Sequence, residues 1–168
     1  MRIDFRTLIP TLVMACAVAT NAAASDFKPA AIDFNQDLAE MRIMLQRRCE
    51  SVEEREISPP QIPETKDKQI QIDCSGFAFE GEKRLAEFVF RDGDLMLVWV
   101  LTNASEEEML EEKMRAAFGE PTYQGRTFIA FTRHQAALRT DTPEVLFYAP
   151  AAAAMFEEWF AQSQDVTQ

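Results

Sequence analysis

The first apolar pattern after residue 25 has the period of an α-helix. Its members recur at spacings of three and four residues and are Phe34, Leu38, Met41, Leu45, Cys49 and Val52. Such a stripe is typical of one buried helix face. Asp33 is suited to cap this helix, with Gln36 as the reciprocal partner in a capping box. We expect the helix to end before Ser58-Pro59-Pro60, and a charged, proline-rich loop to lead to Gln69.

From Gln69 onward the pattern changes to alternation, which is typical of β-strands. The expected strands are Gln69 to Glu80, Arg84 to Arg91 and Leu95 to Leu101, with a two-residue hairpin turn at Asp92-Gly93. On the first strand, Phe77 and Phe79 are out of phase with Cys74. A β-bulge at Ser75-Gly76 would return all three side chains to one face.

The third of these strands is apolar on both faces. One face carries Leu95, Leu97, Trp99 and Leu101, and the other carries Met96, Val98 and Val100. A strand of this kind is either central and covered on both sides, or it has one open face that forms a partner surface. Leu95, Leu97, Trp99 and Leu101 are therefore the candidate interaction surface.

The second half of the chain repeats the order of a helix followed by strands. A helix is predicted from Ser105 to Phe118, with Ser105 and Glu108 as a capping box and Gly119 at its end. A turn at Tyr123 to Arg126 leads to strands at Thr127 to Arg133, Gln135 to Arg139 and Val145 to Tyr148. Pro150 then opens a last helix, whose apolar face consists of Met155, Phe156, Trp159 and Phe160. The expected order is α-β-β-β-α-β-β-(β)-α. Short turns between consecutive strands predict an α+β fold, with a mainly antiparallel sheet and helices packed on one face.

The first 24 residues have the layout of a secretory signal peptide. Arg2 and Arg6 form a positive start, an apolar run follows, and small residues precede a cleavage site after Ala24. The run is shorter than the ~20 residues of a transmembrane helix. We therefore expect residues 1–24 to be removed and residues 25–168 to form a single periplasmic or secreted domain. The alternative is a lipid anchor at Cys16, because Val13-Met14-Ala15-Cys16 resembles a bacterial lipobox.

The cysteine count supports an exported protein with one disulfide. After cleavage only Cys49 and Cys74 remain, and two cysteines in an exported chain most simply form one bridge. They lack the Cys-x-x-Cys spacing of redox sites. A structural disulfide is therefore expected between Cys49 and Cys74.

Charge and side-chain chemistry exclude several function classes. The chain has 17 Lys and Arg against 28 Asp and Glu, a net charge of -11, which argues against nucleic acid as a partner. The one histidine, His134, has no nucleophile motif beside it, so we expect neither a catalytic site nor a cofactor or metal. Asp92-Gly93-Asp94 is explained by a hairpin rather than a calcium loop. The acidic run Glu106, Glu107, Glu108, Glu111 and Glu112 is interpreted as a solvated helix face.

One turn and the element order resemble known exported modules. A helix, then Phe118-Gly119-Glu120-Pro121-Thr122-Tyr123, then a hairpin is similar to the β-lactamase-inhibitor-protein fold and to small lipoproteins of outer-membrane assembly. Those families bind proteins and are not enzymes, although neither supplies a motif from which functional residues could be transferred. The resemblance implies a non-enzymatic module that binds another exported or envelope protein. The alternative is a small-molecule or lipid carrier, or an enzyme, with an apolar pocket between helices and sheet.

Overall fold

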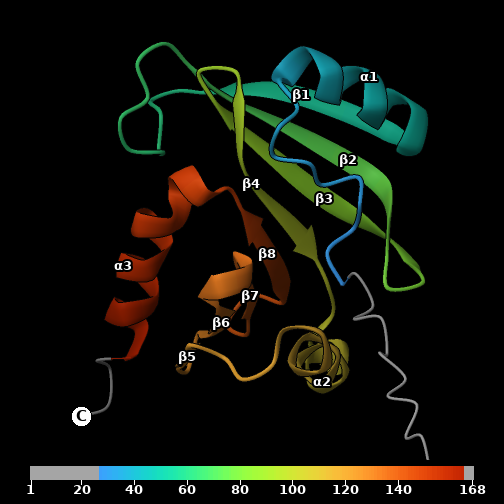
Figure 1. The fold of residues 1–168 in the computed structure, drawn as a ribbon. Helices are drawn as coiled ribbons and strands as arrows, with labels where there is room; N and C mark the ends of the chain where they lie inside the picture. Colours follow the sequence, from blue (N-terminus) through green and yellow to red (C-terminus); the bar gives the residue numbers. More distant parts are fainter. Residues whose placement is uncertain (1–26, 165–168) are drawn as a thin grey trace, which may run out of the picture.

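The computed structural model describes residues 27–164, so the predicted signal peptide (1–24) and the alternative anchor Cys16 lie outside the described residues. The described chain forms an eight-stranded sheet in the order β1-β2-β3-β4-β8-β7-β6-β5, with every neighbouring pair antiparallel (Figure 1). The strands are β1 (Ser51–Ile57), β2 (Gln69–Phe79), β3 (Glu82–Arg91), β4 (Asp94–Leu101), β5 (Tyr123–Gln124), β6 (Phe128–Phe131), β7 (Ala136–Arg139) and β8 (Glu144–Tyr148). The predicted α+β class and antiparallel sheet are confirmed.

The sheet consists of two meanders that follow the same plan. Helix α1 (Leu38–Arg48) precedes β1 to β4, and helix α2 (Glu107–Phe118) precedes β5 to β8. The two meanders meet where β4 pairs with β8, with Val98 opposite Phe147. This places the last strand of each meander at the centre of the sheet, where both of its faces need cover.

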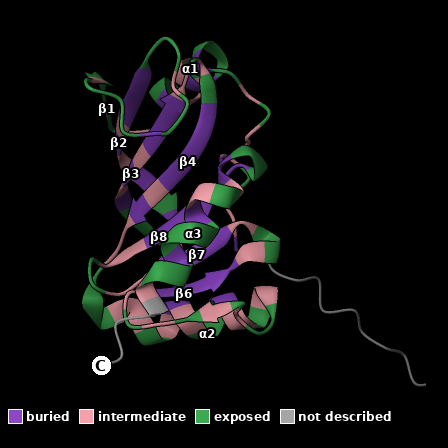
Figure 2. Ribbon diagram, turned by 90° about the vertical axis from the view of Figure 1, so that its left-hand side faces the viewer, coloured by how far each residue is buried: buried purple, intermediate pink, exposed green. Residues whose placement is uncertain are grey.

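The helices are divided between the two faces of the sheet. Met41 of α1 and Met114 of α2 are buried in one core, whereas Phe156 and Phe160 of α3 (Ala153–Gln164) are buried in a second core on the opposite face (Figures 1 and 2). The expectation that all helices pack on one face is therefore wrong for α3. Residues 145–148 of β8 are all buried. Because α1 and α2 already occupy one face, α3 is needed to cover the other.

Three local predictions from the sequence are confirmed. The pairing of β2 with β3 shifts between Ser75 and Phe77, as a bulge at Gly76 requires. Asp92 and Gly93 form the β3–β4 turn with φ values of 55° and 98°, which is the left-handed geometry of a type I′ hairpin. Gly119 ends α2 with a φ of 80°.

The first helix begins later and ends earlier than predicted. Its N-cap is Asp37, whose carboxylate accepts a hydrogen bond from the Glu40 N–H at 2.9 Å, and Glu40 closes the capping box. Asp33 instead accepts a hydrogen bond from the Asn35 N–H in a turn. Several Asp and Asn residues lie close together here, and the backbone course decides which of them can cap. The helix ends at Arg48.

Residues Ser51–Ile57 form edge strand β1, which the sequence pattern assigned to a helix end and a loop. The strand pairs with β2 along its whole length, from Ser51 opposite Ser75 to Ile57 opposite Gln69. Its side chains are largely exposed, and most are charged. Charged edge strands lack the apolar alternation on which strand prediction depends, although they discourage edge-to-edge association.

The second helix and the strand that follows it also differ in detail. A short 3-10 turn, Ala104–Glu106, precedes α2, and the capping pair is Asn103 with Glu106 instead of Ser105 with Glu108. Buried Arg84 holds Glu106 in this position, because the two terminal nitrogens of Arg84 each donate a hydrogen bond to the Glu106 carboxylate at 2.8 Å. The predicted turn after α2 contains the two-residue strand β5.

Candidate functional site

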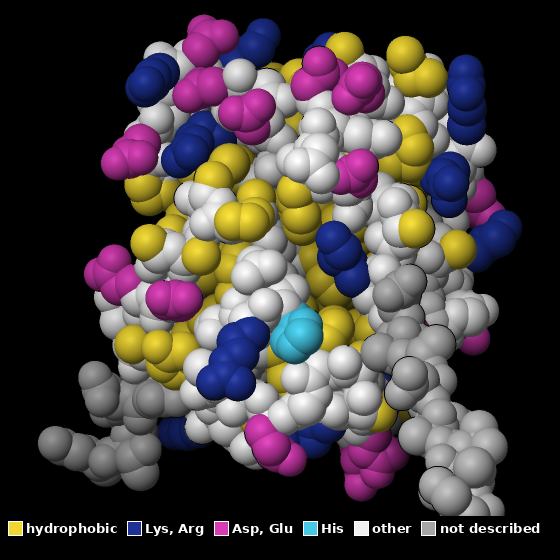
Figure 3. Space-filling model, in the orientation of Figure 1, with side chains coloured by type: hydrophobic (Ala, Val, Ile, Leu, Met, Phe, Trp, Pro, Cys, Tyr) yellow, Lys and Arg dark blue, Asp and Glu magenta, His cyan; other side chains and the backbone are white. Residues whose placement is uncertain are grey.

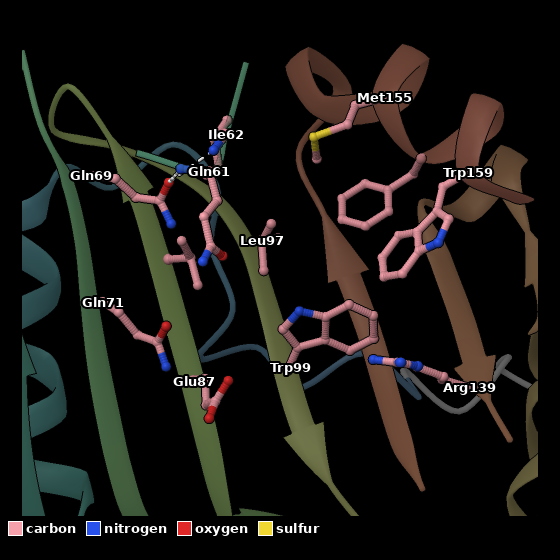
Figure 4. Close-up of a pocket in the computed structure, with 12 residues that line it drawn as sticks. Gln61, Ile62, Gln69, Gln71, Glu87, Leu97, Trp99, Arg139, Met155 and Trp159 are labelled. Atoms are coloured by element: carbon pink, nitrogen blue, oxygen red, sulfur yellow. Dashed lines mark hydrogen bonds between the residues drawn. The ribbon is translucent and has the colours of Figure 1, made fainter. Parts of the chain in front are cut away.

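A groove lies on the face of the sheet that carries α3. It is bounded on one side by α3 and on the other by the loop over residues 58–68, and its floor is formed by β2, β3 and β4 (Figure 4). Its volume is about 290 Å³. Figure 2 looks onto this face: α3 covers the strands of the second meander, and β2, β3 and β4 continue beyond the end of the helix.

The floor of the groove contains two buried amides. Gln69 and Gln71 are 4% and 8% exposed and alternate with the core residues Ile70 and Ile72 along β2. The side-chain oxygen of Gln69 accepts hydrogen bonds from the backbone N–H groups of Gln61 and Ile62, both at 2.8 Å. Gln69 thereby fixes the loop wall of the groove.

The remaining amide groups of these two glutamines face the groove. The side-chain nitrogen of Gln71 donates to Asp73 at 2.8 Å. Within the described part of the chain, the Gln69 nitrogen and the Gln71 oxygen have no hydrogen-bond partner, and Figure 4 shows both side chains extending over the floor. Among the described residues, the buried side-chain atom without a partner is the Tyr148 hydroxyl, so these two amide atoms reach the open space of the groove although most of each side chain is buried. These groups are therefore available to a ligand.

Glu87 on β3 supplies the carboxylate of the floor. Burial raises its pKa above the ordinary value, and the negative charge of Asp73 raises it further. Asp73 is its direct cross-strand neighbour. Arg55 and a hydrogen bond from Gln71 act in the opposite direction and lower the pKa. The net result is a half-buried acid next to a second acid, which favours the approach of a cation.

The α3 side of the groove is aromatic. Trp99 of β4 lies edge-on to Phe156 and Trp159 of α3, with ring centroids 6.3 Å and 6.2 Å apart. Trp159 is 38% exposed although it lies in this cluster. These two tryptophans are the only ones in the sequence, so the indole signals of the protein report on this groove.

Arg139 of β7 closes one end of the groove. Its guanidinium carbon lies 5.9 Å from the ring centroid of Trp99, 5.8 Å from that of Phe128 and 5.5 Å from that of Trp159. These are cation–π distances. Arg139 also donates to Asp141 at 2.7 Å and to Glu144 at 3.3 Å. Hydrogen bonding to Asp141 raises the Arg139 pKa, and the two carboxylates hold the guanidinium beside the aromatic rings.

The loop wall is held by an aspartate of the β3–β4 turn. The Asp92 carboxylate accepts hydrogen bonds from the backbone N–H groups of Lys66, Asp67 and Lys68. The shortest of them joins the Asp67 nitrogen to the Asp92 Oδ1 at 2.7 Å. The first two of these bonds are the main reason why the Asp92 pKa lies below its ordinary value. The turn that the sequence identified therefore has a second role, because it anchors the loop beside the groove.

The candidate interaction surface does not form a single face. Leu97 and Trp99 line the groove, whereas Leu95 is buried with the α1 and α2 core. The pairing of β3 with β4 shifts between Val89 and Phe90, which reverses the side-chain alternation before Leu97. Leu101 lies at the far end of β4, near Arg84 and outside the groove.

The predicted disulfide is present and lies away from the groove. Cys49 and Cys74 are joined, with their Cα atoms 5.4 Å apart, and Cys74 is fully buried under α1. His134 is exposed and stacks on Phe118 at a centroid distance of 4.8 Å. Over residues 27–164, no group of three or more His, Cys, Asp and Glu side chains could hold a metal ion.

Four phenylalanines of β2 and β3 are packed into a core between the sheet and the helices α1 and α2. Phe77, Phe79, Phe88 and Phe90 are at most 2% exposed beneath α1 and α2. On the surface drawn in Figure 3, hydrophobic side chains gather in the middle, and charged side chains crowd the end that carries α1 and the 58–68 loop. No helix between residues 27 and 164 is long and apolar enough to cross a membrane.

The groove itself was not identified from the sequence, although one signal was available. Gln69, Gln71 and Asp73 alternate with Ile70, Ile72 and Cys74, which indicates a strand with one polar face but not what encloses that face. The contributions of α3, β7 and the 58–68 loop require the tertiary structure. Comparisons of the chain with protein-family models, with curated proteins and with solved structures found no match.

Proposed function

We propose that this chain is an exported, non-catalytic binding module whose ligand occupies the groove between α3 and the 58–68 loop. The observation that carries the proposal is the combination of buried amides on the groove floor with an exposed tryptophan on its rim. Concave sites that combine aromatic and aliphatic side chains with placed polar groups are typical of ligand binding. Exposed tryptophans are likewise enriched at interfaces.

The chemistry of the lining favours binding over catalysis. Among the described lining residues, the ionisable side chains are Glu87 and Arg139. Arg139 is engaged by Asp141 and Glu144, so the groove contains no nucleophile with an adjacent base. The closed phenylalanine core favours a binding module over a carrier with an internal apolar pocket.

Two features support export to an oxidising compartment. The first is the signal-peptide pattern of residues 1–24. The second is the Cys49–Cys74 disulfide, because such bonds persist in the periplasm and outside the cell. Mass spectrometry of the processed N-terminus tests this part: Ser25 as the first residue supports a soluble exported protein, and a diacylated Cys16 supports the anchored form.

Photo-crosslinking in cells that express the full chain tests the role of the groove. A photoreactive residue replaces Met155 on the α3 wall, and the control position is Ile43 of α1, which is 54% exposed on the opposite face. We expect a discrete adduct at position 155 that is lost in a Trp159→Ala background and absent from position 43. No adduct at 155, the same adduct at both positions, or an adduct that does not depend on Trp159 would refute the proposal.

A further inference from the structure

We propose that the groove recognises a basic side chain, Lys or Arg, presented by a polypeptide, in the space between Glu87 and the indole of Trp99. This inference rests on the proposed function, because it names the chemistry of the ligand for the same groove. It is drawn from the juxtaposition of a carboxylate that forms no ion pair within the described residues, an aromatic wall, and one amide nitrogen and one amide oxygen without partners.

The charge of the floor is unbalanced in favour of acid. Asp73 and Glu87 are cross-strand neighbours on the groove face. Asp73 forms an ion pair with Arg55 on β1, but Glu87 takes part in none of the ion pairs among residues 27–164. A cation that reaches Glu87 would relieve the repulsion between the two carboxylates, and the half-buried setting strengthens this attraction relative to open solvent.

The protein already contains an example of the proposed contact. Arg139 rests against Trp99 and Trp159 at one end of the groove while Glu144 accepts a hydrogen bond from it. Aromatic rings combined with a carboxylate thus hold a guanidinium at this end of the site. Glu87 lies on the other side of Trp99, with which it pairs across β3 and β4, so a second cation would meet the same combination of groups.

The amides indicate that the cation belongs to a polypeptide. The free side-chain nitrogen of Gln69 can donate to a carbonyl, and the free side-chain oxygen of Gln71 can accept from an N–H (Figure 4). A peptide backbone presents both groups next to each side chain. The groove volume of about 290 Å³ lies at the lower limit of small-molecule pockets, which is roughly 300 Å³. A groove of this size suits one long side chain with its flanking backbone.

The test titrates short peptides into the whole processed protein, as purified after export, and follows the two indole N–H signals by NMR. The probes are acetylated, amidated pentapeptides with four alanines and a central arginine, lysine or citrulline. Citrulline has the shape of arginine without its charge. We expect the arginine and lysine peptides to shift the signals of Trp99 and Trp159 at concentrations about tenfold below the citrulline peptide, since a charged hydrogen bond is roughly twice as strong as a neutral one.

Matched variants assign this preference to one carboxylate. Glu87→Gln keeps the size and hydrogen-bonding reach of the side chain, and it should remove the preference for arginine over citrulline. The control Glu112→Gln, on an exposed position of α2 across the sheet, should keep the preference. Denaturant unfolding checks that both variants are folded.

Several outcomes would overturn the inference. These are equal binding of the citrulline peptide, no indole shift with any basic peptide, a preference that survives in Glu87→Gln, and spermidine binding as tightly as the arginine peptide, which would indicate a free amine ligand. The inference can fail while the proposed function stands. This is the case if the neutral peptide binds in the groove as well as the basic ones, or if the crosslink at position 155 is present without any preference for basic peptides. Loss of that crosslink would instead refute the proposed function.

Discussion

The disulfide allows a prediction whose size follows from the loop that it closes. Cys49 and Cys74 are 25 residues apart in sequence. In the chain-entropy relation, a loop of this length stabilises the folded state by about 3.5 kcal/mol near room temperature, because the cross-link restricts the unfolded chain. Cys49→Ala should therefore lower the free energy of unfolding by about 3.5 kcal/mol. Cys74→Ala should cost about 1 kcal/mol more, since its sulfur is fully buried and its removal leaves a small cavity.

Guanidinium unfolding followed by tryptophan fluorescence measures these differences. Either single substitution breaks the bond, so the Cys49→Ala, Cys74→Ala double variant should be no less stable than Cys74→Ala alone. The slope of the free energy against denaturant should also rise in all three variants, because an unbridged chain exposes more surface when it unfolds.

Two results would refute this reasoning. A loss below about 1 kcal/mol in Cys49→Ala would mean that the unfolded chain is already restricted over residues 49–74, for instance by residual pairing of β1 with β2. Additive losses from the two single substitutions would mean that the thiols act separately rather than through their bond.

Three further predictions concern the packing around the site and its supports. A hydrogen bond from Arg84 lowers the Glu106 pKa to about 2 from an ordinary value of 4.5, so the contribution of this carboxylate to stability is complete above pH 4.5 and is lost as the pH falls toward 2. Glu106→Gln should flatten this decline in a pH series of unfolding midpoints, and an unchanged decline would contradict the assignment. Phe160→Ala should cost about 3–5 kcal/mol, since the ring is fully buried between α3 and the sheet; a loss under about 1 kcal/mol in denaturant unfolding would mean that α3 is not docked as described. Gly81→Ala should cost about 1 kcal/mol because of its positive φ alone. Gly76→Ala should cost about 1 kcal/mol more than Gly81→Ala, because the new Cβ would also lie 2.5 Å from the Glu50 Cγ, and equal melting temperatures of the two variants would contradict this steric contribution.

The predictions that succeeded depend on residues a few positions apart. The Ser75-Gly76 bulge follows from a change of alternation within one strand. The Asp92-Gly93 hairpin and the helix end at Gly119 follow from backbone preferences of single residues. Such signals act through φ and ψ and through neighbouring side chains, so they are readable without knowledge of the fold.

The predictions that failed depend on partners far along the chain. Strand β1 forms because β2 offers a free edge, and its own charged sequence gives little indication of a strand. Glu106 replaces Glu108 in the cap because Arg84, 22 residues earlier, is buried beside it. The choice between Asp33 and Asp37 as N-cap was likewise decided by tertiary context, since the Leu38 N–H donates to the Gly93 carbonyl at 3.0 Å.

The sequence by itself determined the α+β class, the antiparallel hairpins and the pairing of Cys49 with Cys74, because periodicity, turn chemistry and a count of two cysteines are properties of the chain alone. Only the tertiary structure decided which face α3 covers and what lies beside it. The groove brings together Gln69, Glu87, Trp99 and Trp159 from four elements spread over about 90 positions of the chain. Strand order and helix placement set their distances, and no local pattern encodes them.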